Sequence, residues 1–168
     1  SLHAALPFFK RGVPKQNDTC WYVDAVEEAM CFGWIDSTYK KLAPGQPASQ
    51  CFVPRKVGSA WSELNKERCR RMIHLGKMTA AGYVVLPDMN PRHFKFDPRI
   101  IRALKRRPGA WQYFQSCPPL YQRVRCDTIQ IKSHQPKLFR QRLTKFANAC
   151  QAQQMIGQWC DGGRLPVK

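Results

Sequence analysis

The sequence is poor in acidic residues and lacks the short motifs that identify many enzyme families. Asp and Glu together number 11 against 28 Lys and Arg, which gives a formal net charge of +17 and a pI near 10.0. There is no G-x-S-x-G nucleophile motif, no P-loop and no glycine-rich Rossmann fingerprint. The enzyme classes that depend on these motifs are therefore excluded, and the sequence favours a binding role over catalysis.

Metal-binding and disulfide patterns are missing as well. No two cysteines stand in a C-x-x-C pair, and the four histidines are scattered without the spacing of metal ligands. The eight cysteines are an even number, but a chain of 168 residues is long enough to fold without bridges. We therefore expect reduced, buried thiols, no metal site, no cofactor and no catalytic residue.

Long apolar runs are also missing. No run approaches the roughly 18 apolar residues of a membrane-spanning helix, and no signal peptide is visible. Together with the reduced cysteines, this favours a cytoplasmic protein. The length and a hydrophobic content of 43% predict a single packed domain over residues 1–168. The sequence does not indicate an oligomeric state.

The positive charge is concentrated in the second half of the chain. Residues 85–168 contain 16 basic and 4 acidic residues, a net charge of +12, whereas residues 1–84 have a net charge of +5. A field of this sign attracts polyanions such as nucleic acid. The alternative is a solvated basic surface without a dedicated partner. The candidate polyanion surface consists of Arg99, Arg102, Lys105, Arg106, Arg107, Arg123, Arg125, Lys137, Arg140 and Lys145.

Two amphipathic segments predict helices in residues 1–86, the mixed α+β part of the chain. The first helix is expected over residues 22–32, with Gly33 positioned to end it. The second helix is expected over residues 60–75, with Ser59 as its N-cap.

Short β-branched and aromatic segments predict strands in the same part. Residues 34–39 and 51–53 are expected to form a small antiparallel pair. The apolar segment 4–9 contains Pro7, which cannot donate a ladder hydrogen bond, so we expect an edge strand there at most.

Residues 94–157 predict a helical part. The helices, which are separated by prolines, are expected over residues 98–107, 109–116, 119–134 and 136–151. The last is the clearest, because one apolar face follows the helical spacing of 4, 3 and 4 residues through Phe139, Leu143, Phe146 and Cys150. The tail after Gly157 is expected to be loose, with Trp159 as a candidate for docking on the helices. The sequence thus predicts a predominantly helical α+β fold, in which a small short-stranded antiparallel element precedes a helical C-terminal part.

Charged and aromatic side chains cluster along the N-terminal helices and strands. Arg68 falls in the apolar stripe of the second helix, so we expect it to pair with Glu27 or Asp36. Polar groups beside tryptophans on an apolar floor suit the recognition of a ligand. The alternative is that the tryptophans are core residues and the charges form structural pairs. The candidate binding cleft consists of Glu27, Glu28, Trp34, Asp36, Arg55, Lys56, Trp61, Asn65 and Arg68.

Several motifs carry a family resemblance. Residues 22–36 read Y-x-D-A-V-E-E-A-x-C-F-G-W-I-D, and residues 52–68 read F-x-P-R-K-x-x-S-x-W-S-x-x-N-K-E-R. The motifs F-K-F-D-P-R-I-I-R-A-L, A-W-x-x-F and Y-Q-R-V-R follow between residues 94 and 125. With these motifs the chain resembles the YdeI/OmpD-associated family, often called bacteriocin-protection proteins, over residues 20–157.

The resemblance implies a small bacterial protein that is linked to resistance against bacteriocins or cationic antimicrobial peptides, and to association with an outer-membrane porin. It implies no established reaction. Relatives have a longer N-terminal segment, so a short or truncated one is expected here. Where relatives are acid-rich, as in R-P-E-E-F-E-K-R-L, residues 135–143 read Q-P-K-L-F-R-Q-R-L. This replacement of carboxylates by cations argues against attraction of a cationic peptide to that face.

Three functions follow from these observations. The favoured one is a non-enzymatic stress or antimicrobial-peptide (bacteriocin) resistance factor that binds a protein or peptide partner. The alternative is a basic nucleic-acid-binding module, with Trp111, Tyr113 and Tyr121 near the cations as stacking partners for bases. The third is a small-molecule enzyme, which no motif in the sequence supports. Its acid/base groups would be Glu27, Glu28 and Asp36, and its nucleophile Cys31 or Cys51.

Overall fold

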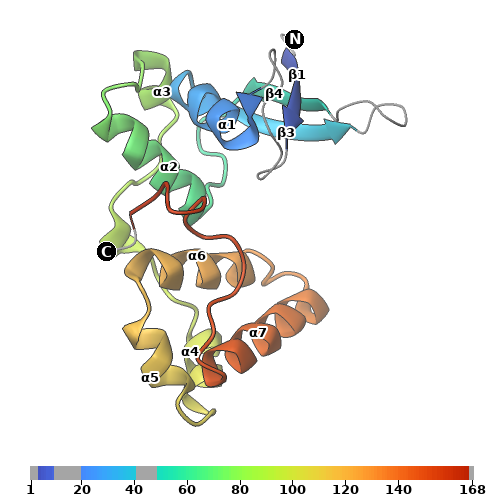
Figure 1. Ribbon diagram of the computed structural model, residues 1–168, viewed down its shortest axis with the longest axis vertical. Helices are drawn as coiled ribbons and strands as arrows, with labels where there is room; N and C mark the ends of the chain where they lie inside the picture. The colour runs from blue at the N-terminus through green and yellow to red at the C-terminus, as the bar shows by residue number, and fades with distance from the viewer. Residues whose placement is uncertain (1–3, 10–19, 41–48, 167–168) are drawn as a thin grey trace. The chain divides into compact units, whose positions relative to one another are not determined.

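The computed structural model describes residues 4–9, 20–40 and 49–166 of the chain (Figure 1). The chain divides into two compact units. Unit 1 comprises Ser1–Trp61 and Arg68–Met89, and unit 2 comprises Ser62–Glu67 and Asn90–Lys168. Strands and helices mix in the N-terminal part and helices alone follow in the C-terminal part, which confirms the predicted fold class.

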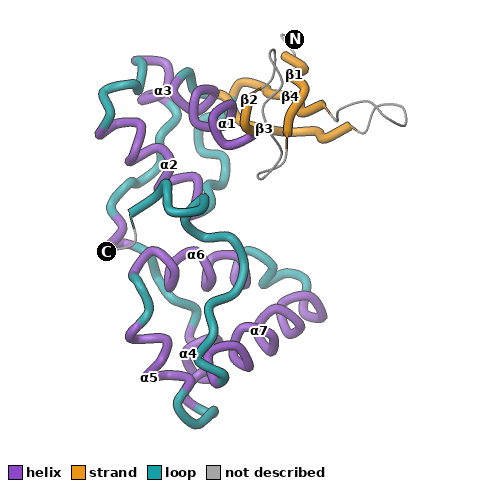
Figure 2. The backbone as a smooth tube through the Cα atoms, in the orientation of Figure 1, coloured by secondary structure: helices purple, strands orange, loops and turns teal. Residues whose placement is uncertain are grey.

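Unit 1 contains a sheet of short strands, drawn in orange in Figure 2. The strands are β1 (Ala4–Phe9), β2 (Cys20–Trp21), β3 (Trp34–Lys40) and β4 (Ser49–Pro54), in the order β2-β1-β4-β3. The predicted antiparallel pair is confirmed as β3 and β4, and β4 also pairs antiparallel with β1.

The expectation for the first strand is wrong in one respect. β1 lies inside the strand order, because its last two residues pair in parallel with β2. Pro7 is in register with Ser49 of β4, whereas the pairing with β2 involves only Phe8 and Phe9. Pro7 has no backbone N–H to donate, and it takes no part in the described pairing with β2.

Helix α1 (Tyr22–Cys31) follows the sheet's second strand and ends as predicted. The N–H of Gly33 donates to the carbonyl of Met30 at 3.0 Å, and Gly33 has a φ of 74°, a value that favours glycine. A side chain here would also meet the carbonyl oxygen of Ala81, because its Cβ would lie 2.8 Å from that atom.

Helix α2 (Glu63–His74) begins three residues later than predicted. The Oγ of Ser62 accepts a hydrogen bond from the N–H of Asn65 at 3.2 Å, which is the contact expected of a capping serine. The predicted cap, Ser59, instead accepts from Nη1 of Arg55 at 3.3 Å. Helix α3 (Ala80–Val84) then completes the helices of unit 1.

The core of unit 1 forms between α1, the sheet and the later turns of α2. Its buried members are Val26, Met30, Phe52 and Cys69, and the half-buried Trp34 and Trp61 are among the residues that pack around them. The apolar faces found in the sequence thus meet in one cluster, which removes them from water.

Unit 2 begins with a short 3-10 helix, η1 (Pro91–His93), and continues with four α-helices. These are α4 (Pro98–Lys105), α5 (Ala110–Ser116), α6 (Pro119–Gln130) and α7 (Pro136–Gln151). The bounds of α7 are those predicted, whereas α6 ends four residues before the predicted end at His134.

A chain of aromatic contacts forms the core of unit 2. Phe114 packs edge-on against Phe146 at 6.0 Å between ring centroids, and Tyr121 packs against Phe146 at 6.3 Å. Burial of rings in such contacts is a large stabilising term.

The tail after Gly157 is packed within unit 2 and is not loose, and the expected docking of Trp159 is confirmed. The ring of Trp159 lies edge-on to that of Tyr121 at 5.5 Å, and Leu165 is buried beside Leu120 and Val124. The apolar side chains of the tail cover these helices. The packing of Leu165 was not predicted, because the tail has no helical periodicity. Among the described residues, no helix is long and apolar enough to cross a membrane.

Candidate functional site

The residues of the predicted N-terminal cleft do not all lie in one unit. Asn65 belongs to unit 2, and the other eight belong to unit 1. Among those eight, Glu28 and Lys56 are exposed, whereas Glu27, Arg55 and Arg68 are buried. Trp34, Asp36 and Trp61 are half-buried.

Arg55 is enclosed by its own neighbours. Its guanidinium lies 3.7 Å from the ring centroid of Trp61, and its Nη1 donates to the carbonyl of Ala60 at 3.0 Å. The side chain is only 5% exposed, and this burial lowers the pKa of Arg55, with the nearby charges of Cys69 and Asp36 acting in the opposite direction. The geometry is that of a packed structural cation.

Two of the three carboxylates of the cleft have partners inside unit 1. Oε2 of Glu27 accepts from Nη1 of Arg71 at 2.8 Å, and Oδ2 of Asp36 accepts from the hydroxyl of Tyr22 at 2.5 Å. Pairing of Arg68 with Glu27 or Asp36 stays a prediction. These contacts favour the alternative in which the charges of this region fix its packing.

Among the described side chains, seven cysteines are free thiols: Cys31, Cys51, Cys69, Cys117, Cys126, Cys150 and Cys160. All of these but Cys51 and Cys160 are buried. Burial raises the pKa of the Cys31 thiol, and it raises the pKa of the Cys69 and Cys150 thiols to about 12. Such thiols carry little thiolate at neutral pH and are poor nucleophiles. In the described part of the chain, no group of three or more His, Cys, Asp or Glu side chains could hold a metal ion.

Unit 2 carries a group of exposed cations on two helices that pack against each other. The guanidinium of Arg99 on α4 lies 4.1 Å from the ring centroid of Phe139 on α7, so the two helices present their cations side by side. Neither helix contains an acidic residue. We call this group the basic surface; it consists of Arg99, Arg102 and Lys105 on α4, Arg106 directly after α4, and Lys137 and Arg140 on α7.

Arg99 is the one member with a described ion pair. It donates from Nη2 to Asp97 at 2.5 Å, and this contact lowers the pKa of the Asp97 carboxyl. Lys105 lies with its Nζ 5.2 Å from the ring centroid of Trp111. Arg107 was also predicted to belong to the polyanion surface. It is half-buried and directly follows Arg106 in the sequence.

The structure corrects the prediction for Arg123. This side chain is held inside unit 2, where its Nε donates to Glu63 at 3.2 Å and its Nη2 donates to Glu67 at 3.1 Å. The guanidinium is therefore neutralised by two carboxylates and is not part of an open polyanion surface. The carboxylates lie 56 and 60 residues earlier in the chain, a distance that local sequence patterns do not bridge.

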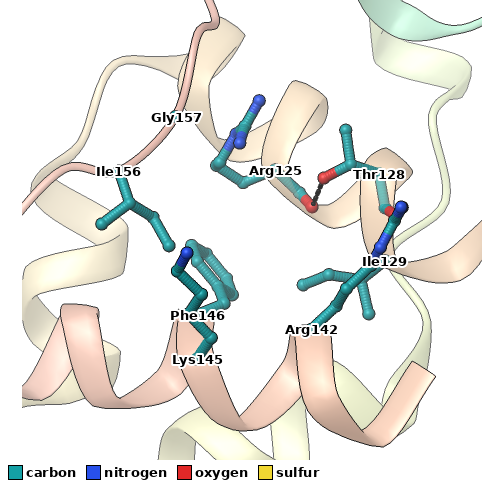
Figure 3. A pocket seen from close by; sticks show the side chains of 8 residues that line it. All are labelled: Arg125, Thr128, Ile129, Arg142, Lys145, Phe146, Ile156 and Gly157. Atoms are coloured by element: carbon teal, nitrogen blue, oxygen red, sulfur yellow. Dashed lines mark hydrogen bonds between the residues drawn. The ribbon is translucent and has the colours of Figure 1, made fainter. Parts of the chain in front are cut away.

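The two remaining predicted cations, Arg125 and Lys145, line a cavity of about 140 Å³ in unit 2 (Figure 3). Arg142 is a third cation in its wall, and no acidic side chain lines it. Apolar side chains complete the wall beside the cations (Figure 3). The full set of lining residues is Arg125, Thr128, Ile129, Arg142, Lys145, Phe146, Ile156 and Gly157.

Backbone carbonyls hold the two guanidinium groups of the cavity. Nη1 of Arg142 donates to the carbonyl of Thr128 at 2.5 Å, and Nη2 of Arg125 donates to the carbonyl of Gln158 at 2.5 Å. The Thr128 hydroxyl in turn donates to the carbonyl of Arg125 at 2.8 Å (Figure 3). These acceptors are neutral, so they orient the cations without cancelling their charge.

Sequence reasoning missed Arg142 and Thr128 as neighbours of a site. A usable signal was present, since Arg142 and Lys145 stand three residues apart on one helix and therefore near one another. The other half of the cavity comes from α6 and from the segment after α7, and sequence spacing does not relate these to α7.

Gly157 allows the chain to pass close to Arg125. It has a φ of 72°, and a Cβ at this position would collide with Nη1 and lie 3.0 Å from Cζ of Arg125. Only glycine fits both conditions without displacing the guanidinium.

Comparisons with known proteins match two segments of the chain. Residues 93–153 match the family described as Bacteriocin-protection, YdeI or OmpD-Associated, and residues 3–85 match a Domain of unknown function (DUF8412). No curated protein and no solved structure matches. The predicted family is confirmed in the helical segment, while the motifs at residues 22–36 and 52–68 fall in the segment that the other domain matches.

Proposed function

Because residues 93–153 belong to the bacteriocin-protection, YdeI or OmpD-associated family, we propose that this protein is a non-enzymatic stress and antimicrobial-peptide (bacteriocin) resistance factor. It works in the cytoplasm and acts by binding a protein or peptide partner. The observation that carries the binding role is the basic surface of α4 and α7, where exposed cations gather on two helices without acidic residues.

The charge of the basic surface specifies the charge of the partner. Like charges repel across an interface, so a cationic peptide is disfavoured there, whereas an acidic segment is attracted and steered toward it. We therefore propose that the partner presents a run of carboxylates. Protection then comes from binding an acidic protein or peptide of the cell or of the bacteriocin system, and not from capturing a cationic peptide directly.

Nucleic acid is the second candidate partner. The contact between Lys105 and Trp111 supports it, because cations beside an aromatic ring can bind a phosphate and stack a base. Tyr121 is fully buried and does not serve as the predicted stacking partner. Trp111 and Tyr113 are half-buried and keep part of their rings in solvent.

Fluorescence anisotropy tests the two partners together. A labelled oligo-glutamate peptide and a labelled mixed-sequence DNA and RNA are titrated with the full chain at about 50 and 200 mM salt. We expect the peptide to bind at the lower salt and to lose most of its affinity at the higher one, because ion pairs at a surface are screened.

Charge-reversal variants locate the binding. The pair K137E and R140E changes the basic surface, and the pair K56E and K77E makes the same charge change at exposed positions of unit 1. We expect the first pair to weaken peptide binding by about tenfold or more and the second to change it by less than about threefold. Equal effects of the two pairs, or no peptide binding at the lower salt, would overturn the proposal. Binding of nucleic acid alone would select the second candidate.

A further inference from the structure

The cavity of unit 2 combines cationic side chains with apolar walls, a combination that is not described for the basic surface. It has three cationic side chains in its wall, and it also has apolar walls made by Ile129, Phe146 and Ile156 (Figure 3). Ile129 and Phe146 belong to the buried core of the unit, with exposed fractions of 3% and 2%. A site of this kind suits a ligand that is charged at one end and apolar at the other.

We propose that this cavity binds a small organic phosphate, in which one phosphate group is attached to an apolar body about the size of a benzene ring. The proposal is independent of the protein's partner and of bacteriocin resistance. It concerns only the residues that line the cavity.

The size of the cavity limits the apolar body. A volume of about 140 Å³ is close to that of apolar cavities which accept a benzene molecule. A nucleic-acid strand does not fit into such a space, although a single phosphate group at its mouth does. The ligand is therefore a small molecule rather than a polymer.

The cations specify the charged group. Arg125 and Arg142 present planar guanidinium groups, which bind phosphate oxygens through paired N–H donors, and Lys145 adds a third positive charge. The acceptors that already hold the guanidinium groups are backbone carbonyls, so three positive charges face the cavity without an acidic side chain among its lining residues. A dianion balances them better than a monoanion does.

Arg125 provides a separate indication of an anion-binding site. Its Nε is buried and has no hydrogen-bond acceptor among the described residues. Burial lowers the pKa of Arg125; the nearby Tyr121 opposes this change, whereas the neighbouring charge of Arg142 adds to it. An anion between the two guanidinium groups would relieve their mutual repulsion.

Isothermal titration calorimetry with phenyl phosphate on the full chain tests the proposal. Inorganic phosphate and benzoate serve as the two comparison ligands, since the first lacks the apolar body and the second lacks the second negative charge. We expect phenyl phosphate to bind about tenfold more tightly than either. Absence of binding at millimolar phenyl phosphate, or binding of all three ligands with equal affinity, would overturn the proposal.

Variants place the ligand in the cavity. We expect R142Q and K145Q each to weaken phenyl phosphate binding by about tenfold, because each removes a cation from the wall. The matched control is R140Q on the same helix, which removes an exposed cation that does not line the cavity and should leave the affinity unchanged. K145Q keeps the test decisive if R142Q is less stable, since Lys145 is exposed.

A glycine substitution provides a second, geometric test. G157A places a methyl group against the Arg125 guanidinium and is expected to reduce the affinity for phenyl phosphate by about tenfold without removing a charge. Amide chemical shifts should move near Thr128, Phe146 and Ile156 when phenyl phosphate is added to the wild-type chain. Shifts confined to another region, or full affinity in both R142Q and G157A, would place the ligand elsewhere. Because R140Q removes a member of the basic surface and R142Q and G157A do not, failure here is distinguishable from failure of the proposed partner binding.

Discussion

At the scale of single residues, Arg123 shows how partners distant in sequence decide the role of a charge. Its guanidinium contacts the carboxylates of Glu63 and Glu67, whose residues are 2% and 8% exposed. The sequence alone predicts that a basic residue in a cation-rich segment belongs to an exposed basic surface. Burial next to two carboxylates instead gives Arg123 a structural role. Charge counts predict the field of a protein and do not predict which cations are available.

The first prediction concerns this residue. Arg123→Gln removes the cation that both carboxylates share, and we expect the free energy of unfolding to fall by roughly 2–3 kcal/mol, because breaking a buried pair leaves its charges poorly solvated. Urea denaturation followed by circular dichroism measures the change. The control is Arg102→Gln at an exposed position of α4, which is expected to change the stability by less than about 0.5 kcal/mol. An equally small effect of Arg123→Gln would contradict the structural role.

At the scale of secondary-structure elements, the start of α2 offers the second prediction. Ser62→Ala removes the oxygen that accepts from the N–H of Asn65, and we expect a loss of about 1 kcal/mol in the free energy of unfolding. Ser59→Ala removes only the 3.3 Å contact with Arg55 and should cost less. Urea midpoints of the two variants give the comparison, and a larger loss for Ser59→Ala would show that the helix begins where the sequence alone suggested.

The elements also show what the sequence could and could not predict. The spacing of Phe139, Leu143, Phe146 and Cys150 predicted α7, because one apolar stripe runs along most of the helix. The start of α2 was predicted too early, since Trp61 continues the apolar stripe although it lies before the helix. The parallel pairing of β1 with β2 has no local signal, because parallel strands pair across a connection rather than a tight turn.

The candidate site was less predictable than the elements. The tryptophans and charges near the N-terminus did mark a clustered region, but the described contacts there are internal to unit 1. The cavity of unit 2 depends on the approach of Gly157 to Arg125 across more than thirty residues. Whether two such residues meet depends on tertiary packing, which the periodicity of single segments does not encode.

At the scale of the whole molecule, the buried titratable groups predict how stability depends on pH. Burial raises the pKa of the Cys69 and Cys150 thiols from 9.0 to about 12 and that of the Tyr121 phenol from 10.0 to about 12. Between pH 9 and 12 the folded chain therefore holds protons that the unfolded chain has lost. The stability that these groups contribute is complete below about pH 9 and is lost as the pH rises toward 12.

The third prediction follows from this loss of stability at high pH. The urea midpoint should fall between pH 8 and pH 10, and it should fall less in Cys69→Ala, which lacks one of the buried thiols. Comparison of the two proteins cancels the titration of lysines, which both share. A wild-type urea midpoint that falls no more than that of the variant would contradict the conclusion that the buried Cys69 thiol keeps its proton in the folded chain.

The two family matches and the two compact units divide the chain at different places. Residues 62–67 lie in the segment matched by the domain of unknown function, yet they are part of unit 2, where Glu63 and Glu67 hold Arg123 and Leu64 packs beside Leu120. A recombination event that moved residues 93–153 alone into another gene would leave these contacts behind, together with Trp159 and Leu165. We therefore expect the two matched segments to be inherited together, because a new neighbouring domain would have to supply carboxylates for Arg123 and apolar cover for Leu120 and Val124.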